Sequence, residues 1–265
     1  MMQARKLSSP GPFTVNDIRE EDRYELSNGH RIYCAPAGEN HARRNLSGGS
    51  LLDSDPDVQW SGVDAGFALG PGTMRAPDVS VAPPPPQKSG WIAGVPPLAV
   101  EYADRGQNEA ELQTKIQQLL SAGTRYVWVV RLTGPHRVEV YTPGEPMRLL
   151  SITDTLQAPG ILRNPVPVRA LFDRRAAHRV MLRNLLQREG YDDLDAVRRE
   201  GKAESKAEAE RETQVNALFT ILAARGIQVD AETGARIRRC RASGQLDAWL
   251  RKAAVAQKAE DVFRQ

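Results

Sequence analysis

One segment of the chain places a helix between two apolar runs, and this order restricts the fold more than any other feature of the sequence. Residues 98–100 form a short apolar run that ends at Glu101, and residues 126–132 form a nearly continuous one. Between them, residues 108–122 carry leucine and isoleucine at helical spacing and stop at Gly123, a residue typical of helix C-caps. A strand, a helix and a strand within roughly 35 residues predict a parallel strand pair joined by a crossover helix.

The residues around this segment extend it into a larger sheet. After the turn at 133–135, residues 137–141 alternate valine with polar side chains, which predicts an antiparallel hairpin. Residues 57–82 contain further short apolar runs closed by proline or glycine. The sequence therefore predicts an α/β fold, a mixed sheet flanked by helices.

The composition changes after residue 173, where alanine, glutamate, arginine and leucine recur at helical spacing. We expect an α/β domain over residues 1–173 and an all-helical extension over 174–265. The apolar stripe through Leu218, Phe219 and Leu222 needs a surface to cover it, so we interpret the extension as a module for homo-oligomerisation, as a dimer, or for partner binding.

Charge leaves a second interpretation of the extension open. Residues 174–265 hold 19 Lys and Arg against 14 Asp and Glu, while the whole chain has a net charge of +3. A basic helical surface is compatible with direct contact to nucleic acid. The side chains that would make this contact are Arg236, Arg238, Arg239 and Arg241.

Several classes of protein are disfavoured by composition. The two cysteines cannot build a disulfide framework or a cysteine zinc site, and the four histidines form no helical pair for a transition metal. No apolar run approaches the roughly 18 residues that span a bilayer. The polar start MMQARKLSSPGP has no secretory apolar region. We therefore expect a cytoplasmic protein with no membrane partner.

Two carboxylates and a lysine are the strongest candidates for chemistry. Asp78 opens the apolar strand 79–81, Glu101 ends the next strand, and Lys115 lies in the crossover helix. Carboxylates on adjacent strands can hold a divalent cation through oxygen, and a nearby lysine can orient water and stabilise charge on a phosphoryl group. Two such carboxylates should also raise each other's proton affinity. This set suits metal-assisted hydrolysis of a phosphodiester.

The order of several short motifs matches a known family over roughly residues 13–173. The motifs are Tyr24-Glu25-Leu26, Asn28-Gly29, Pro77-Asp78-Val79, Pro96-Pro97, Val100-Glu101, Lys115 and the entry Gly123-Thr124-Arg125-Tyr126-Val127-Trp128. With these residues the chain resembles the Uma-two family of restriction-endonuclease-like proteins, within the PD-(D/E)XK nuclease superfamily.

The resemblance implies a restriction-endonuclease-like fold and a magnesium-dependent endonuclease that acts on DNA. Asp78 and Glu101 would ligate Mg²⁺, or Mn²⁺ in its place, and Lys115 would assist the water. Glu25 would be a supplementary carboxylate from the first helical segment. In that family the lysine has moved from the strand to the next helix, which fits Ala103 at the usual lysine position.

Departures from the family pattern keep two other functions open. Tyr102-Ala103-Asp104 follows the glutamate where the family has a small residue and serine, and Leu119 replaces an aromatic residue. The alternatives are a catalytically degenerate nucleic-acid-binding or regulatory module of the same fold, and a helical interaction protein on an inert scaffold. His41, on the helix predicted over residues 38–52, is interpreted as an ordinary surface histidine.

Overall fold

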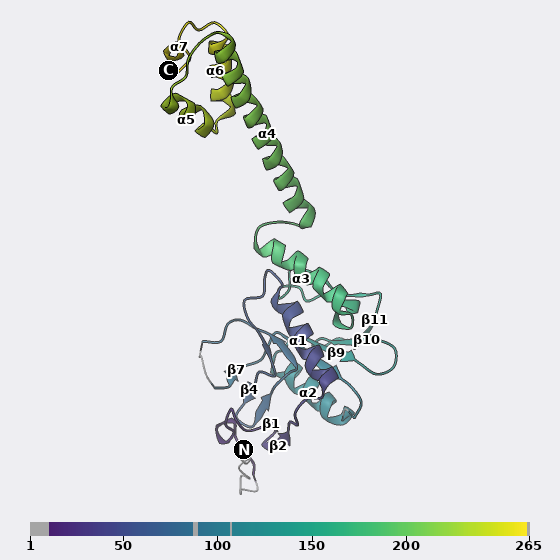
Figure 1. Cartoon of the computed structure of the whole chain (residues 1–265). Coiled ribbons are helices and arrows are strands. Elements are labelled where there is room, and N and C mark those ends of the chain that lie inside the picture. Colours follow the sequence, from purple (N-terminus) through teal and green to yellow (C-terminus); the bar gives the residue numbers. More distant parts are fainter. Residues whose placement is uncertain (1–10, 87–89, 107, 264–265) are drawn as a thin grey trace. The chain divides into compact units, whose positions relative to one another are not determined.

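The computed structural model describes residues 11–86, 90–106 and 108–263, and the polar start of the chain at residues 1–10 lies outside them. The chain forms two compact units, Met1–Asp192 and Asp193–Gln265. Figure 1 shows the sheets and helices of the first unit and the all-helical second unit.

The described residues of the first unit form sheets of six, five and two strands, the last made of β12 and β13, with helices between and around the two larger sheets. The larger sheet has the strand order β11-β10-β9-β8-β6-β3, and the smaller has the order β2-β1-β5-β4-β7. The strands are β1 (Tyr24–Ser27), β2 (His30–Tyr33), β3 (Ser61–Val63), β4 (Phe67–Gly70), β5 (Thr73–Arg75), β6 (Val79–Val81), β7 (Ile92–Ala93), β8 (Leu98–Ala103), β9 (Tyr126–Arg131), β10 (Arg137–Tyr141), β11 (Arg148–Ser151), β12 (Thr155–Leu156) and β13 (Val166–Pro167). The helices are η1 (Val15–Asp17), α1 (Glu39–Asp53), α2 (Glu109–Ala122), η2 (Val168–Leu171) and α3 (Arg174–Arg188).

The predicted crossover is confirmed. Strands β8 and β9 pair in parallel from Leu98 opposite Tyr126 onward, and β10 returns antiparallel to β9. The connecting helix α2 begins where the Asn108 side chain accepts a hydrogen bond from the Glu111 amide. It ends at Gly123, whose φ of 116° belongs to the left-handed region that favours glycine. The mixed sheet flanked by helices is thus the observed fold class.

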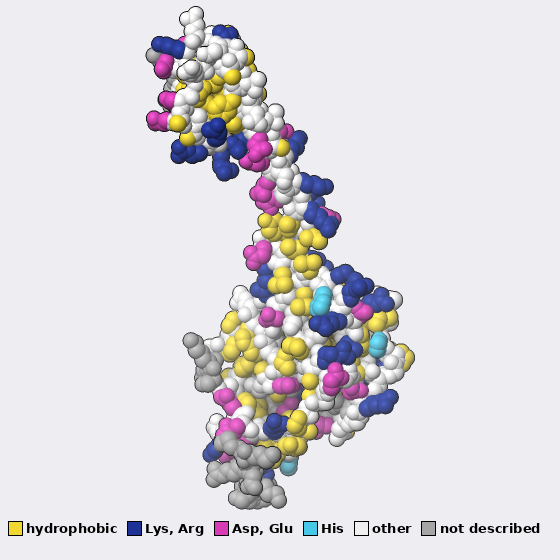
Figure 2. Space-filling model, viewed as in Figure 1, with side chains coloured by type: hydrophobic (Ala, Val, Ile, Leu, Met, Phe, Trp, Pro, Cys, Tyr) yellow, Lys and Arg dark blue, Asp and Glu magenta, His cyan; other side chains and the backbone are white. Residues whose placement is uncertain are grey.

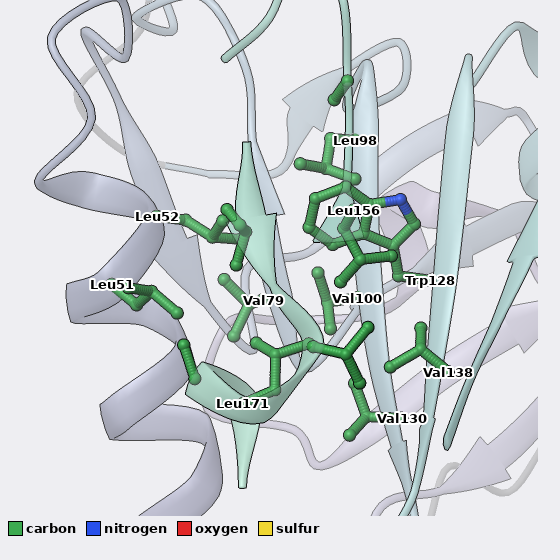
Figure 3. Close-up of a cluster of buried hydrophobic side chains, with 14 of the residues drawn as sticks. Leu51, Leu52, Val79, Leu98, Val100, Trp128, Val130, Val138, Leu156 and Leu171 are labelled. Carbon is green, nitrogen blue, oxygen red and sulfur yellow. The ribbon is translucent and has the colours of Figure 1, made fainter. Parts of the chain in front are cut away.

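Both faces of the larger sheet are covered, because successive residues of each strand point to opposite sides. On one face Val100 and Trp128 pack with Leu51 and Leu52 of α1 and with Leu171, as Figure 3 shows. On the other face the buried residues of β8 and β9 pack against Leu112, Ile116 and Leu119 of α2. Glu101 alternates with Val100 and therefore belongs to the face that α2 covers.

The structure corrects the position of Glu25, which lies on strand β1 and not in a helical segment. Among the described residues before it, the short η1 turn is the helical element, and β1 pairs antiparallel with β2. Asn28 and Gly29 connect the two strands with φ of 50° and 81°. Asn-Gly with both residues at positive φ favours a two-residue hairpin, which is why this segment forms strands.

The boundary between the units also differs from the sequence interpretation, which placed it between residues 173 and 174. Helix α3 belongs to the first unit because Ala176 and Val180 are buried in its core. The Arg188 guanidinium donates to the backbone carbonyls of Asp53, Ser54, Asp55 and Val58 at 2.7 to 3.1 Å. These contacts tie the end of α3 to the end of α1. The division falls after Asp192.

The second unit is helical, as the sequence predicts for this part of the chain. Its helices are α4 (Leu194–Ala224), α5 (Ala231–Arg239), α6 (Ser243–Ala253) and α7 (Ala259–Phe263). Leu218 and Leu222 of α4 pack in one buried cluster with Ile237, Leu246 and Trp249. The apolar stripe of α4 is therefore covered within its own unit. No helix of the described residues is long and apolar enough to cross a membrane.

Candidate active site

A cleft of about 750 Å³ opens in the first unit between the smaller sheet and the start of α1. Its lining includes three of the four residues that the sequence singles out, Glu25, Asp78 and Lys115. Glu101 lies next to this lining, because its carboxylate is bound to Lys115. The structure thus brings all four candidates together.

Strand register explains why the two predicted metal ligands are neighbours. Strands β6 and β8 are antiparallel with Val79 opposite Val100, so Asp78, which comes just before β6, and Glu101 each lie one residue beyond this pair. The Asp78 carboxylate accepts a hydrogen bond from the amide of Tyr102, the residue after Glu101, and the charge of Asp78 helps to raise the pKa of Glu101, so the two carboxylates are close together. Glu101 lies within β8 and does not end it, since the strand continues to Ala103.

The Asp78 carboxylate is held on both oxygens. Its Oδ2 accepts a hydrogen bond from the Tyr102 amide at 2.6 Å. Its Oδ1 lies 2.9 Å from Nε2 of His41 and accepts a longer hydrogen bond of 3.4 Å from Asn45 Nδ2. His41 and Asn45 are one turn apart on α1 and so face the same oxygen. These contacts fix the orientation of the carboxylate.

Lys115 reaches from α2 into the same group of charges. Its Nζ lies 2.8 Å from Glu101 Oε1 as an ion pair and donates to Glu25 Oε1 at 3.0 Å and to the Ala76 carbonyl at 2.8 Å. Burial opposes its charge, but Glu101 and Glu25 outweigh this and raise the pKa of Lys115. The lysine is therefore a fixed cation, which serves to position groups and to neutralise negative charge.

Glu101 responds in the opposite way to the same surroundings. Burial raises its pKa to about 8, Asp78 and Glu25 add to this, and Lys115 opposes it. The sequence predicts that converging carboxylates resist ionisation, and for Glu101 the direction agrees, although burial is the larger cause. A cation placed beside Glu101 would therefore favour its charged form.

Glu25 connects Lys115 to a second buried cation. Its Oε2 accepts from Arg75 Nη1 at 2.9 Å, and its Oε1 accepts from the Ala76 amide and from Lys115. Arg75 is fully buried and also pairs with Glu111 and donates to Gln118. Glu25 thus bridges Arg75 and Lys115 and holds the Lys115 ammonium group in place. Because both of its carboxylate oxygens are used in this way, Glu25 is better suited to position Lys115 than to bind a metal ion.

Removing Arg75 should destabilise the first unit strongly. Arg75→Met leaves Glu25 and Glu111 without their shared cation, and we expect the free energy of unfolding to fall by about 3 kcal/mol, as for other broken buried ion pairs. Arg163→Met is the matched control, because Arg163 pairs with Asp57 where both side chains are about half exposed. It should cost less than about 1 kcal/mol. Denaturant unfolding of both variants measures the difference, and equal losses would contradict a central role for Arg75.

Two cleft residues were missed or misinterpreted from the sequence. His41, interpreted as a surface histidine, contacts Asp78, and this hydrogen bond raises its pKa against the opposing effect of burial. Asp64 belongs to none of the motifs that the sequence shows. It follows β3, where Val63 lies opposite Val79, and its amide donates to the Asp78 carbonyl at 3.4 Å. Burial and the charge of Asp78 raise the pKa of Asp64, which also lines the cleft.

The departures from the family pattern can also be placed. Ala103 is buried on β8, on the face that α2 covers, so a lysine from α2 can supply the charge that a lysine at this position would bring. Asp104 accepts a hydrogen bond from Asn40 at 2.9 Å and lines the cleft. Neither residue blocks the group formed by Asp78, Glu101 and Lys115.

The donor set suits a hard divalent cation that is bound by few protein groups. Among the described residues, no three histidine, cysteine or acidic side chains are grouped so that they alone could hold a metal ion. Mg²⁺ characteristically keeps several waters and uses one or two carboxylates together with substrate phosphate oxygens. Asp78 and Glu101 match that requirement, and a cage built entirely from protein is not needed.

A mixed sheet flanked by helices, with two carboxylates and a lysine beside a cleft, defines a protein of the restriction-endonuclease-like class. The Uma2 family, described as "Putative restriction endonuclease", matches residues 13–166, and the chain belongs to this family. The fold is also similar to the crystal structure of a putative nuclease of the DUF820 group from Anabaena variabilis ATCC 29413. That similarity has a TM-score of 0.53 and 18% identity and covers 61% of this chain and 98% of the other. No curated protein matches.

Proposed function

We propose that the protein is a magnesium-dependent endonuclease that hydrolyses phosphodiester bonds in DNA, with Mn²⁺ as a working substitute. Membership of the Uma2 family supports nuclease activity. The observation that carries the finer proposal is the convergence of Asp78, Glu101 and Lys115 beside one cleft.

Each residue has a separate part in the proposed reaction. Asp78 and Glu101 would hold the metal ion, which supplies a Lewis acid for the phosphate and lowers the pKa of bound water. Lys115 places its positive charge where charge develops on the phosphoryl group and orients the attacking water. Glu25 keeps the ammonium group of Lys115 directed toward Glu101 through its own contacts with Lys115 and Arg75.

One observation favours the degenerate module of the same fold as the second candidate. Asp78 already accepts hydrogen bonds on both oxygens, and Glu101 is already paired with Lys115. A site satisfied by its own residues can keep the fold and bind nucleic acid without cleaving it.

The two candidates are separated by incubating the purified protein with supercoiled plasmid, linear duplex and single-stranded DNA. We expect nicked and linear products with Mg²⁺ or Mn²⁺ and none with chelator. Stable binding of DNA without products in either metal would favour the degenerate module and contradict the endonuclease.

A further inference from the structure

The apolar residues of the second unit pack mainly against one another. The stripe of α4 that suggests association packs within the unit, where Leu218 and Leu222 are fully buried and Phe219 is partly buried against the same cluster. Among its described residues, the exposed large hydrophobic side chains are Leu194 and Val255. Two single residues at different places in the unit do not make an apolar interface.

Arginine side chains are what this unit presents instead. Arg236, Arg238 and Arg239 occupy the last turn of α5, and Arg241 follows it. All four are exposed. Figure 2 shows dark blue side chains gathered over α5. We refer to these four residues as the α5 arginine cluster.

Aromatic rings order part of the cluster without neutralising it. The Arg236 guanidinium lies 5.5 Å from the ring centre of Trp249, and that of Arg238 lies 4.9 Å from the ring centre of Phe219. Such contacts hold a guanidinium in place and leave its charge and most of its N–H donors free. The cluster is therefore partly preorganised for a ligand.

Ion pairs do not neutralise the cluster, although Glu208 lies close enough for the charge of Arg241 to help lower its pKa. In the part of the chain that the structure describes, none of the four arginines forms an ion pair with an acidic residue, while the neighbouring Glu208 is paired with Arg211. Basic residues are favoured in the last turn of a helix by its dipole. That explanation does not extend to Arg241, which lies beyond the helix end, or to the stacking of two arginines on rings.

We propose that the α5 arginine cluster binds the sugar-phosphate backbone of a DNA duplex. Guanidinium groups match phosphate oxygens in geometry and charge, and unpaired surface arginines gain most from releasing the counterions of DNA. The inference rests on DNA being the substrate of the first unit. It adds a second, sequence-independent contact that raises affinity and does not select bases.

The test measures DNA binding by the full chain in chelator, so that cleavage cannot contribute. Fluorescence anisotropy of a short labelled duplex is followed between about 50 and 200 mM salt. The variant is Arg239→Glu with Arg241→Glu, because neither side chain stacks on an aromatic ring of the unit's core. The control is Arg198→Glu with Arg199→Glu, which makes the same charge change at exposed positions near the start of α4.

We expect the cluster variant to bind the duplex at least about tenfold more weakly than the parent. The plot of log affinity against log salt concentration should also become less steep, with the magnitude of its slope smaller by roughly 2. The control should keep the slope of the parent. Equal weakening in both variants, or none in the cluster variant, would overturn the proposal. So would unchanged DNA binding with a changed mass in light scattering, since the surface would then serve a protein contact. Failure of this test leaves metal-dependent cleavage standing, and absence of cleavage leaves this binding measurement unaffected.

Discussion

Replacing Glu101 with glutamine should abolish metal-dependent cleavage while the chain keeps its fold. Glutamine preserves the size of the side chain at a position that is almost fully buried, but it cannot provide a charged oxygen ligand. We expect the cleavage rate to fall about a thousandfold, the upper range for the loss of one charge-stabilising group at a phosphoryl or acyl centre. Asp78→Asn should have the same effect. Plasmid nicking under single-turnover conditions gives the rate, and circular dichroism checks the fold.

The chain offers its own control for this experiment. Asp57 also follows a proline, but its carboxylate pairs with Arg163 at the surface, with both side chains about half exposed. Asp57→Asn should therefore retain the parent's activity. Full cleavage by a folded Asp78→Asn variant would show that the assigned site is wrong, whatever the activity of the chain.

The sequence places Asp78, Glu101 and Lys115 near one another because the strands and the helix that position them follow one another closely along the chain. Asp78 comes directly before the short apolar strand β6, Glu101 lies on β8, and Lys115 lies on a helix whose cap and periodicity are both visible in the sequence. Once a crossover helix covers one face of the sheet, a lysine on its buried side must approach the strands beneath it. Contacts within a single strand-helix-strand unit can therefore be predicted from the sequence.

The rest of the site depends on contacts that no local pattern encodes. His41 reaches Asp78 across 37 positions of the chain. Asp64 comes from a residue after β3 with φ of 52°, a conformation that sequence periodicity does not reveal. The sequence interpretation places Glu25 on a helical segment, although the Asn28-Gly29 pair that follows is a hairpin signal. Burial and pairing across the two sheets decide these positions.

The domain boundary failed for a related physical reason. Residues 174–188 have the composition of the helical extension, so composition alone assigns them to it. Helix α3 nevertheless packs on the first unit through small residues, and Ala177 is fully buried. The strongest tie is polar, between Arg188 and the carbonyls that end α1. Packing through small residues and hydrogen bonds to carbonyl groups leave no repeating pattern in the sequence, so the sequence does not show that α3 packs on the first unit.

A fragment that ends at residue 173 should therefore be much less stable than one that ends at residue 192. The shorter fragment loses the buried face of α3 and uncovers the carbonyls that Arg188 caps, and it also leaves Ser54 without its hydrogen bond from the buried Asn184. With hydrogen bonds to a charged group contributing about 1.5 to 3 kcal/mol each, we expect a loss of about 5 kcal/mol or more. For a unit of this size that lowers the melting temperature by about 10 to 20 °C.

The fragment 1–192 should melt cooperatively and close to the first transition of the full chain. Thermal melts of the two fragments followed by circular dichroism give the difference, and Arg188→Met in the 1–192 fragment isolates the contribution of the capping arginine. Equal melting temperatures for the two fragments would place the boundary at residue 173 after all.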